Sequence, residues 1–166
     1  DDVVLATSNA TSDDPVRECA GSVGWALVRG SLDDVRARFL LAAETIGADV
    51  LVRICGDSPL MDHRVIDRAV TEFRCGEWDM VTNVLERTFP RGLSVEVFSI
   101  ALLRRAIAEG GEEADREHVT PWFYRNREHL RIHNIVHDPN LGEERLVVDT
   151  DRKSTRLNSS HKPTSY

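Results

Sequence analysis

Two acidic residues that directly follow short apolar runs are the side chains of this sequence best placed to do chemistry. Asp57 lies in the Gly-Asp-Ser-Pro turn at residues 56–59, after the apolar run 49–55, and Asp149 ends the run 146–148. Ligands of doubly wound sheets bind beyond the carboxyl ends of the strands, and Mg²⁺ prefers one or two fixed carboxylates completed by substrate phosphates and water. The two acids therefore predict a magnesium site if both strands end at one edge of the sheet. The alternative for each acid is a turn or cap residue.

Two further polar clusters allow both a chemical and a structural interpretation. Arg29 precedes a glycine and Ser31 at a predicted helix start. This combination suits an anionic phosphate or carboxylate, and a plain turn with a cap has the same pattern. Arg116, Glu117 and His118 place a cation, an acid and a base within one helical turn, which is compatible with general acid and base catalysis. A salt-bridged helix start is the competing interpretation.

The composition limits the class of protein. The chain has 166 residues with 28 acidic and 21 basic side chains, and its formal net charge is -7. This length predicts one domain, and the acidic balance argues against a nucleic-acid partner, which needs clustered Lys and Arg. No apolar run reaches the roughly 18 residues of a membrane-spanning helix, and the sequence has no secretory signal. The three cysteines lack paired spacing, which fits a reducing compartment. We therefore expect a cytoplasmic protein without a membrane or nucleic-acid partner.

Residues 151–166 differ in composition from the rest of the chain. Both lysines of the sequence, Lys153 and Lys162, lie there, and residues 151–161 resemble the translation of a common sequencing adapter. We therefore predict a domain of residues 1–150 followed by a disordered, non-native tail, which is left out of fold reasoning. A native polar tail is the alternative. The boundary matters because residues 149–151 spell the Asp-Thr-Asp pattern of metal-dependent glycosyltransferases, and Asp151 belongs to the tail.

The elements that must position these residues alternate along the chain. Apolar runs predict strands, and amphipathic stretches with start and stop signals predict helices. The predicted strands are residues 3–7, 25–28, 49–55, a segment near Met80, 94–98, 132–136 and 146–149. The predicted helices are one that starts at the Asp-Asp-Pro of residues 13–15 and ends near Gly21 or Gly24, one that runs from a capping box at residues 31–34 to Gly47, and residues 63–74, 100–109 and 115–127. Strands separated by helices of this length form right-handed crossovers, so we predict an α/β fold with a mostly parallel sheet.

Taken in order, the motifs of residues 1–150 resemble one family. The motifs are Val-Leu-Ala-Thr-Ser at residues 4–8, Asp-Asp-Pro at 13–15, Arg-Gly-Ser at 29–31, the segment 52–60 around Gly-Asp-Ser-Pro-Leu, the segment 89–98, Arg-Glu-His-Val-Thr-Pro at 116–121 and Arg-Leu-Val-Val-Asp-Thr at 145–150. Their order is similar to that of the spore coat polysaccharide biosynthesis protein F family, relatives of the CMP-Kdo and CMP-N-acetylneuraminate synthetases. The resemblance implies a Rossmann-like nucleotidyltransferase fold of the nucleotide-diphospho-sugar transferase type.

The resemblance also implies an activity and a role for each site residue. In the related synthetases a sugar hydroxyl attacks the α-phosphate of CTP. The implied enzyme therefore transfers CMP from CTP to a sugar acid for surface polysaccharide biosynthesis and releases pyrophosphate. Asp57 and Asp149 match the two acids that bind Mg²⁺ in the family, Thr7 and Ser8 match a turn along the nucleotide, and Arg29 matches a ligand-facing arginine. The acceptor sugar is assigned to Arg116, Glu117 and His118.

The sequence departs from the family pattern at both ends. Family members open with a strand and a glycine- and basic-rich loop around the triphosphate, which this sequence lacks, and the Val-Asp-Thr segment runs into the suspect tail. We therefore expect a fragment of a CTP-dependent nucleotidyltransferase that is itself inactive and binds CTP weakly or not at all. The alternatives are a metal-dependent glycosyltransferase and a non-catalytic nucleotide-sugar-binding domain. The sequence does not identify the sugar or show that cytidine is chosen over uridine. It also leaves the oligomeric state open, with a homodimer as one possibility.

Overall fold

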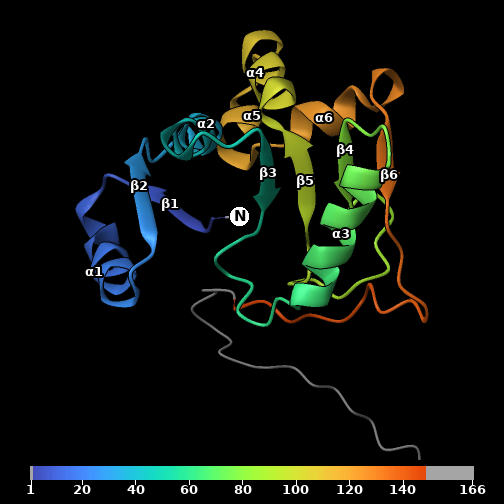
Figure 1. Cartoon of the computed structure of the whole chain (residues 1–166), viewed down its shortest axis with the longest axis horizontal. Coiled ribbons are helices and arrows are strands. Elements are labelled where there is room, and N and C mark those ends of the chain that lie inside the picture. The colour runs from blue at the N-terminus through green and yellow to red at the C-terminus, as the bar shows by residue number, and fades with distance from the viewer. Residues whose placement is uncertain (1, 149–166) are drawn as a thin grey trace, which may run out of the picture.

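The computed structural model describes residues 2–148 of the chain, in which strands and helices alternate (Figure 1). The strands are β1 (Val4–Ser8), β2 (Ala26–Gly30), β3 (Val50–Arg53), β4 (Met80–Thr82), β5 (Glu96–Ser99) and β6 (Ile132–Asn134). The α-helices are α1 (Asp14–Val23), α2 (Val35–Ile46), α3 (His63–Cys75), α4 (Ile100–Glu109), α5 (Glu113–His118) and α6 (Pro121–Arg125), and two short 3₁₀ helices are η1 (Thr11–Asp13) and η2 (Arg127–His129). No helix in this part of the chain is long and apolar enough to cross a membrane.

The strands form two sheets. β1 pairs in parallel with β2, and a four-stranded sheet has the order β3-β5-β4-β6. β6 runs parallel to β4, whereas β5 runs antiparallel to both β3 and β4. β3, β4 and β6 therefore share one direction, which agrees with the predicted α/β fold, and β5 is the reversed strand. Its reversal follows from its connection, because residues 83–95 form a loop rather than the helical crossover that usually joins parallel neighbours.

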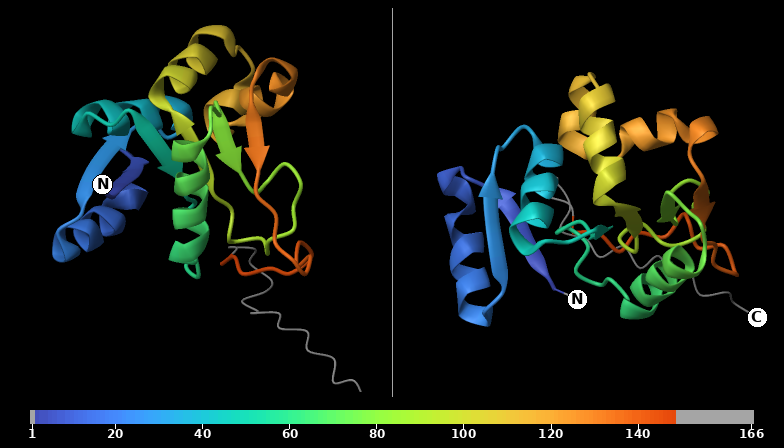
Figure 2. Two further views of the ribbon diagram at one scale, coloured as in Figure 1. Left: turned by 45° about the vertical axis from the view of Figure 1, so that its right-hand side comes forward. Right: turned by 45° about the horizontal axis from the view of Figure 1, so that its top comes forward.

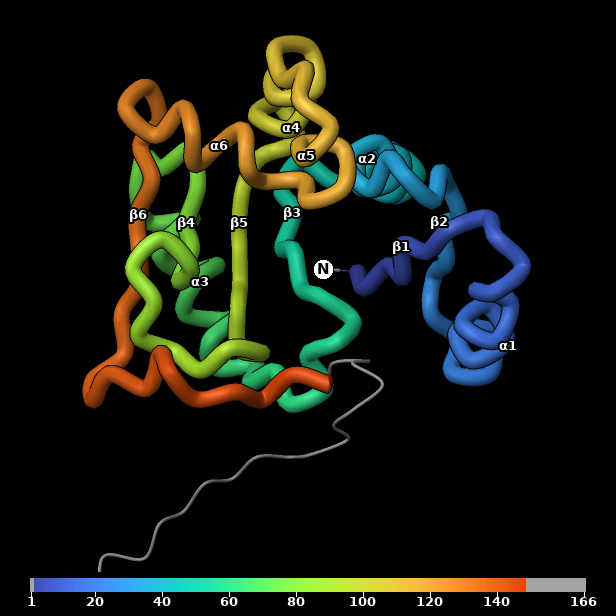
Figure 3. The backbone as a smooth tube through the Cα atoms, turned by 180° about the vertical axis from the view of Figure 1, so that it is seen from behind, coloured from blue at the N-terminus to red at the C-terminus, as the bar shows by residue number. Residues whose placement is uncertain are grey.

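One edge of β1 and one edge of β3 have no strand partner within residues 2–148. Figure 3, which views the molecule from behind, shows β1 and β3 on the two sides of the space between the sheets, with the amino end of the chain between them. Both edges therefore keep unpaired backbone N–H and C=O groups, which are able to pair with a further strand.

The core lies on both faces of the four-stranded sheet. Side chains alternate between the two faces of a strand, so Met80 and Phe98 face α4 and α6, while Val81 and Val97 face α3 (Figure 2, right). Phe123 of α6 packs edge-on against Phe98, with ring centroids 5.0 Å apart. The two apolar layers hold the ends of β3 and β5 in place, and these ends carry the polar residues described below.

The structure corrects the predicted capping residue of α2. The sequence predicts that Ser31 caps this helix, but the cap is Asp34, whose side chain accepts a hydrogen bond from the amide of Ala37 at 2.8 Å. The hydroxyl of Ser31 instead accepts from the amide of Asp34 at 3.0 Å. The helix therefore begins at Val35, and Leu32, which precedes it, is 57% exposed. The predicted end at Gly47 is confirmed, because Gly47 adopts the left-handed conformation that terminates many helices.

A single predicted helix over residues 115–127 is wrong. The chain breaks at Val119, which is buried and has a φ of 68°, a value that β-branched residues rarely adopt. The next helix, α6, starts at Pro121, a residue that favours the first turn of a helix because it lacks an amide donor. Residues 113–125 therefore form two short helices, and the packing of Val119 in the core holds the strained break between them.

The predicted strand at residues 146–149 is not formed over its described part. Residues 146–148 have no regular secondary structure. The preceding residue, Arg145, forms an isolated parallel bridge with Arg91. Asp149 itself lies outside the described residues. The segment nevertheless follows a defined path, because the amide of Leu146 donates to the carbonyl of Arg91 and the amide of Val148 donates to the carbonyl of Asp57.

Candidate active site

Asp57 occupies an exposed turn just after β3. The amide of Ser58 closes this turn on the carbonyl of Cys55 at 3.2 Å, and the Ser58 hydroxyl lies 3.1 Å from Asp57 Oδ1. The alternative role of Asp57 as the cap of the next helix does not apply, because Asp62 caps α3 through the amide of Arg64. The structure thus leaves the Asp57 carboxylate at the carboxyl end of a strand, where an α/β sheet binds its ligands.

The segment that leads to Asp149 passes directly beside Asp57. The amide of Val148 donates to the Asp57 carbonyl at 2.9 Å, so the residue before Asp149 is bonded to the proposed metal-binding turn. The carboxylate of Asp149 lies outside the described residues, and the pairing of the two acids stays a prediction. Within residues 2–148 no group of three or more His, Cys, Asp or Glu side chains is able to hold a metal ion. The oxygen chemistry of the Asp57 turn suits a hard cation that takes its other ligands from elsewhere.

A row of polar side chains crosses the larger sheet at the level of Arg53. In the register of the sheet, Glu96 of β5 lies opposite both Arg53 of β3 and Thr82 of β4, and Thr82 lies opposite Asn134 of β6. Arg53 Nη1 donates to Glu96 Oε2, and the hydroxyl of Tyr124 in α6 donates to Glu96 Oε1. The Tyr124 oxygen also lies 3.1 Å from Thr82 Oγ1. Both oxygens of one buried carboxylate are therefore used to hold an arginine and a tyrosine.

Burial and the Glu96 charge determine the protonation states in this row. Burial is the largest single effect on Arg53 and disfavours its charged form, but the charge and hydrogen bond of Glu96 together with the nearby Cys55 and Tyr124 outweigh it and raise the pKa of Arg53. Burial, with the Glu96 charge in addition, raises the pKa of the Tyr124 hydroxyl well above its usual range. Burial also raises the pKa of the Cys55 thiol. The Arg53 charge opposes this rise, and the charges of Asp57 and Glu96 add to it. The row therefore holds a charged arginine, and Cys55 is not activated as a nucleophile.

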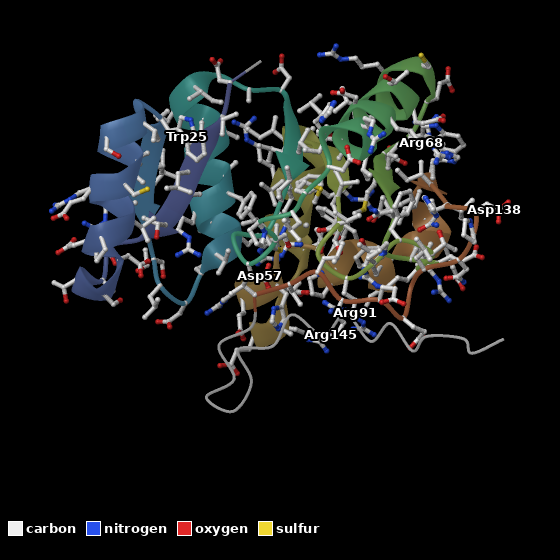
Figure 4. All side chains as sticks on the ribbon, turned by 90° about the horizontal axis from the view of Figure 1, so that it is seen from below. Trp25, Asp57, Arg68, Arg91, Asp138 and Arg145 are labelled. Atoms are coloured by element: carbon white, nitrogen blue, oxygen red, sulfur yellow. The ribbon has the colours of Figure 1, made fainter. Side chains whose placement is uncertain are left out.

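Arg87 and Arg91 continue this polar region along the loop between β4 and β5. Arg87 Nη1 donates to the Ser94 hydroxyl at 3.1 Å, and burial followed by the nearby Arg91 charge lowers the pKa of Arg87. Seen from below in Figure 4, Arg91 lies on the same side of the molecule as Asp57 and Arg145, while Arg68 of α3 lies elsewhere. The polar rim around Asp57 is therefore rich in guanidinium groups.

The backbone around Gly92 fixes the position of Arg91. The amide of Arg91 donates to Glu144 and its carbonyl accepts from Leu146 at 2.6 Å, which ties the loop to the segment that reaches Asp57. Gly92 has a φ of 105°, and a Cβ built at this residue would lie 2.6 Å from the carbonyl oxygen of Leu146. The close approach of these two segments therefore requires glycine.

Replacing Gly92 by alanine is expected to lower the free energy of unfolding by roughly 1–3 kcal/mol, because the new methyl group meets backbone in a conformation that L-residues avoid. Urea denaturation followed by circular dichroism measures the change. Gly111→Ala is the matched control, since nothing lies within 4 Å of a Cβ at Gly111. Equal stabilities of the two variants would contradict this account of the turn.

Thr7, Ser8 and Arg29 are brought together, but by contacts with the protein itself. The Thr7 hydroxyl and the Ser8 amide donate to Asp13 Oδ2 at 2.7 and 2.9 Å. Arg29 donates through Nε to the Ser8 carbonyl, through Nη1 to Asp14 and through Nη2 to the Ala10 carbonyl. These bonds join the ends of β1 and β2, so Arg29 holds the turn in shape. Within residues 2–148 no hydrogen bond or ion pair links this turn to Asp57.

The turn after β1 is expected to loosen at low pH. The hydrogen bonds from Thr7 and Ser8 hold the pKa of Asp13 well below its usual range. A depressed carboxyl pKa contributes stability above the ordinary aspartate pKa, and this contribution is lost progressively as the pH falls below about 4. The protection of the Ser8 amide, measured as its hydrogen-exchange rate relative to the intrinsic rate at each pH, should therefore fall from pH 4 downwards in the native chain. Asp13→Asn should remove this pH dependence, while Asp33→Asn, a change at an exposed acid, should leave it intact.

Arg116, Glu117 and His118 form no hydrogen bond or ion pair with Asp57 within residues 2–148. All three are exposed on α5, and the nearest oppositely charged atoms of Glu117 and His118 are 3.9 Å apart. The segment before α5 is held by the first turn of α2, which follows the carboxyl end of β2, because Arg36 donates to the carbonyls of Ala106 and Gly110. The contact between Glu117 and His118 is compatible with the salt-bridged surface helix that the sequence also allowed, and the assignment of these residues to the acceptor sugar stays a prediction.

The sequence analysis did not assign a role to Arg53, Glu96, Tyr124, Arg87 or Arg91. One signal was present, since Glu96 interrupts the apolar run between Val95 and Val97, and charged residues are rarely buried unless they are paired. Its partners come from other strands and a helix, so no local pattern identifies them. A hollow of about 530 Å³ lined by Val3, Trp25 and Ile46, among others, lies at β1 and β2 and does not include Asp57.

The comparison with protein families identifies one match. A family model described as cytidylyltransferase matches residues 1–157. The chain is 35% identical over 152 residues to the uncharacterized protein MJ1063 of Methanocaldococcus jannaschii, covering 90% of this chain and 61% of that protein. It is 28% identical over 154 residues to the spore coat polysaccharide biosynthesis protein SpsF of Bacillus subtilis, covering 90% of this chain and 62% of SpsF. The chain thus spans less than two thirds of the length of these relatives.

A solved structure supports the same grouping. The fold is similar to that of a cytidylyltransferase from Leptospira borgpetersenii, with a TM-score of 0.86 and 33% sequence identity. The similarity covers 89% of this chain and 63% of the Leptospira chain. The similarity agrees with the nucleotide-diphospho-sugar transferase fold expected from the motifs.

Proposed function

The chain belongs to the cytidylyltransferase family, and on this premise we propose that it is part of an enzyme that transfers CMP from CTP to a sugar acid for surface polysaccharide biosynthesis. The observation that carries the proposal is the exposed Asp57 carboxylate at the end of β3, with the Val148 amide bonded to the same residue at 2.9 Å. This arrangement supports a site in which Asp57 and Asp149 hold Mg²⁺ together. The name of the SpsF relative supports the polysaccharide role.

In the proposed reaction the acceptor hydroxyl attacks the α-phosphorus of CTP. A bond forms between this phosphorus and the sugar oxygen, the bond to the β-phosphate oxygen breaks, pyrophosphate leaves, and the hydroxyl proton passes to solvent or a base. Bound Mg²⁺ would neutralise the charge that develops on the phosphate oxygens. Asp57 and Asp149 would position the cation, and the turn at Thr7 and Ser8 would lie along the nucleotide. Positioning and charge neutralisation are the main protein contributions to such transfers.

Turnover with defined substrates tests this proposal. The 166-residue chain and the longest reading frame that contains it are each incubated with CTP, Mg²⁺ and a panel of sugar acids. Pyrophosphate release and the mass of the product are then measured. We expect a CMP-sugar with the longer form and a preference for CTP over UTP, ATP and GTP. Equal use of all four nucleotides, or cleavage of a nucleotide-sugar donor in place of CTP, would refute the proposal.

A further inference from the structure

We propose that Arg53, Arg87 and Arg91 form a subsite that binds the carboxylate of the acceptor, with Glu96 and Tyr124 as the positioning residues. The inference deepens the proposed function and rests on it for the identity of the acceptor. The subsite lies on the larger sheet and on the loop that enters β5, next to the turn that carries Asp57.

Arg53 supplies a guanidinium group that is fixed by Glu96 on a partly exposed side chain. Its Nη1 donates to Glu96, whose second carboxylate oxygen accepts from Tyr124, and the Glu96 side chain is 3% exposed. The Arg53 side chain is 20% exposed. Glu96 and Tyr124 therefore prevent the guanidinium from rotating, and the accessible part of the side chain stays available to a ligand.

Arg87 and Arg91 add two more cations near the same carboxylate. The Glu96 charge acts on both Arg53 and Arg87, so these two residues share one electrostatic environment. Within the described residues neither Arg87 nor Arg91 forms an ion pair with an acidic side chain, and the nearby Arg91 charge helps to lower the pKa of Arg87. Glu96 is thus bonded to Arg53 and acts on Arg87, whose Nη1 donates to Ser94 two residues before Glu96, and Arg91 adds a third guanidinium group on the same loop. An anion bound among them would relieve the excess positive charge.

The position of the subsite favours the acceptor over the nucleotide. Figure 1 shows β1 and β2 on one side of β3, and β5, β4 and β6 on the other. The turn assigned to the nucleotide follows β1, whereas Arg87 and Arg91 lie in the loop that joins β4 to β5. A ligand bound at these arginines therefore approaches Asp57 from the side opposite the nucleotide, as an attacking acceptor requires. Guanidinium groups bind carboxylates in a bidentate manner, which would orient a sugar acid.

Binding of a sugar acid in the absence of nucleotide tests the subsite. The 166-residue chain is titrated with N-acetylneuraminate, with its uncharged methyl ester and with inorganic phosphate, and the arginine Nε–H and Gly92 amide signals are followed by NMR. We expect the acid to shift these signals. The ester should bind at least about tenfold more weakly than the acid. Arg87→Gln and Arg91→Gln should weaken binding of the acid by a similar factor. Arg68→Gln, an exposed arginine of α3, should not change it.

Several outcomes of the titration would overturn the proposal. Equal binding of the ester and the acid, or no shift with the acid at millimolar concentration, would show that no carboxylate subsite exists. Tighter binding of phosphate at the same arginines, with displacement of the acid, would assign them to nucleotide phosphates. A signal shift that survives in both arginine variants would place the ligand elsewhere. If the turnover assay fails but the acid still shifts the signals in an arginine-dependent manner, only the proposed function is refuted.

Discussion

Replacing Asp57 by asparagine is expected to lower turnover roughly a hundredfold to a thousandfold, the range seen when one group that stabilises transition-state charge is removed. The amide keeps the shape of the side chain but removes the negative charge that a divalent cation requires. Stability should change by less than about 0.5 kcal/mol, because Asp57 is exposed and its side chain meets only the Ser58 hydroxyl within the described residues. The expected phenotype is therefore loss of chemistry without loss of fold.

Two measurements check this expectation, one in the longest reading frame that contains the chain and one in the 166-residue chain itself. Pyrophosphate release is measured in the longest reading frame, and Mn²⁺-induced broadening of the Ser58 and Val148 amide signals is measured in the 166-residue chain. Asp67→Asn is the matched control, since Asp67 is an exposed acid on α3. Unchanged turnover in Asp57→Asn, or equal broadening in both variants, would remove Asp57 from the metal site. A non-catalytic binding domain would then be the better account of the protein.

Replacing Glu96 by alanine is expected to lower the free energy of unfolding by about 3 kcal/mol, at the lower end of the range for breaking a buried ion pair. The substitution leaves Arg53 and Tyr124 without the partner that both use. The cost stays at the lower end because the Arg53 side chain is 20% exposed and is able to recruit water. Urea denaturation gives the change, provided that the slope with denaturant is unchanged.

A double substitution separates pairing from burial in this experiment. Glu96→Leu combined with Arg53→Met replaces the pair by apolar groups of similar size, and such replacements are often neutral or stabilising. The double variant should therefore be more stable than Glu96→Ala. Glu109→Ala breaks an exposed pair with Arg105 and should cost less than about 1 kcal/mol. A similar small effect for Glu96→Ala would show that the buried row is not an energetic unit.

Local patterns in the sequence determined most of the elements. The predicted helix 100–109 agrees with α4, because the capping side chain of Ser99 and the glycine at 110 act within one or two turns of the chain. The position of Asp57 at the end of a strand also follows from local pattern, since a β-branched run and a Gly-Asp-Ser-Pro turn are adjacent in sequence. The order of the family motifs identified the family, which the comparisons then confirmed.

Only the tertiary structure decided which polar groups meet and what each one does. The reversal of β5 places Glu96 between Arg53 and Thr82, and strand order depends on long-range packing that no local window contains. Arg29 has the sequence context of an anion-binding residue, but three protein acceptors around it make it part of the turn. Residue types and spacing thus determined which side chains are available for chemistry. Hydrogen bonds between distant segments decided which of them are already satisfied, because a donor that is paired within the protein has less to offer a ligand.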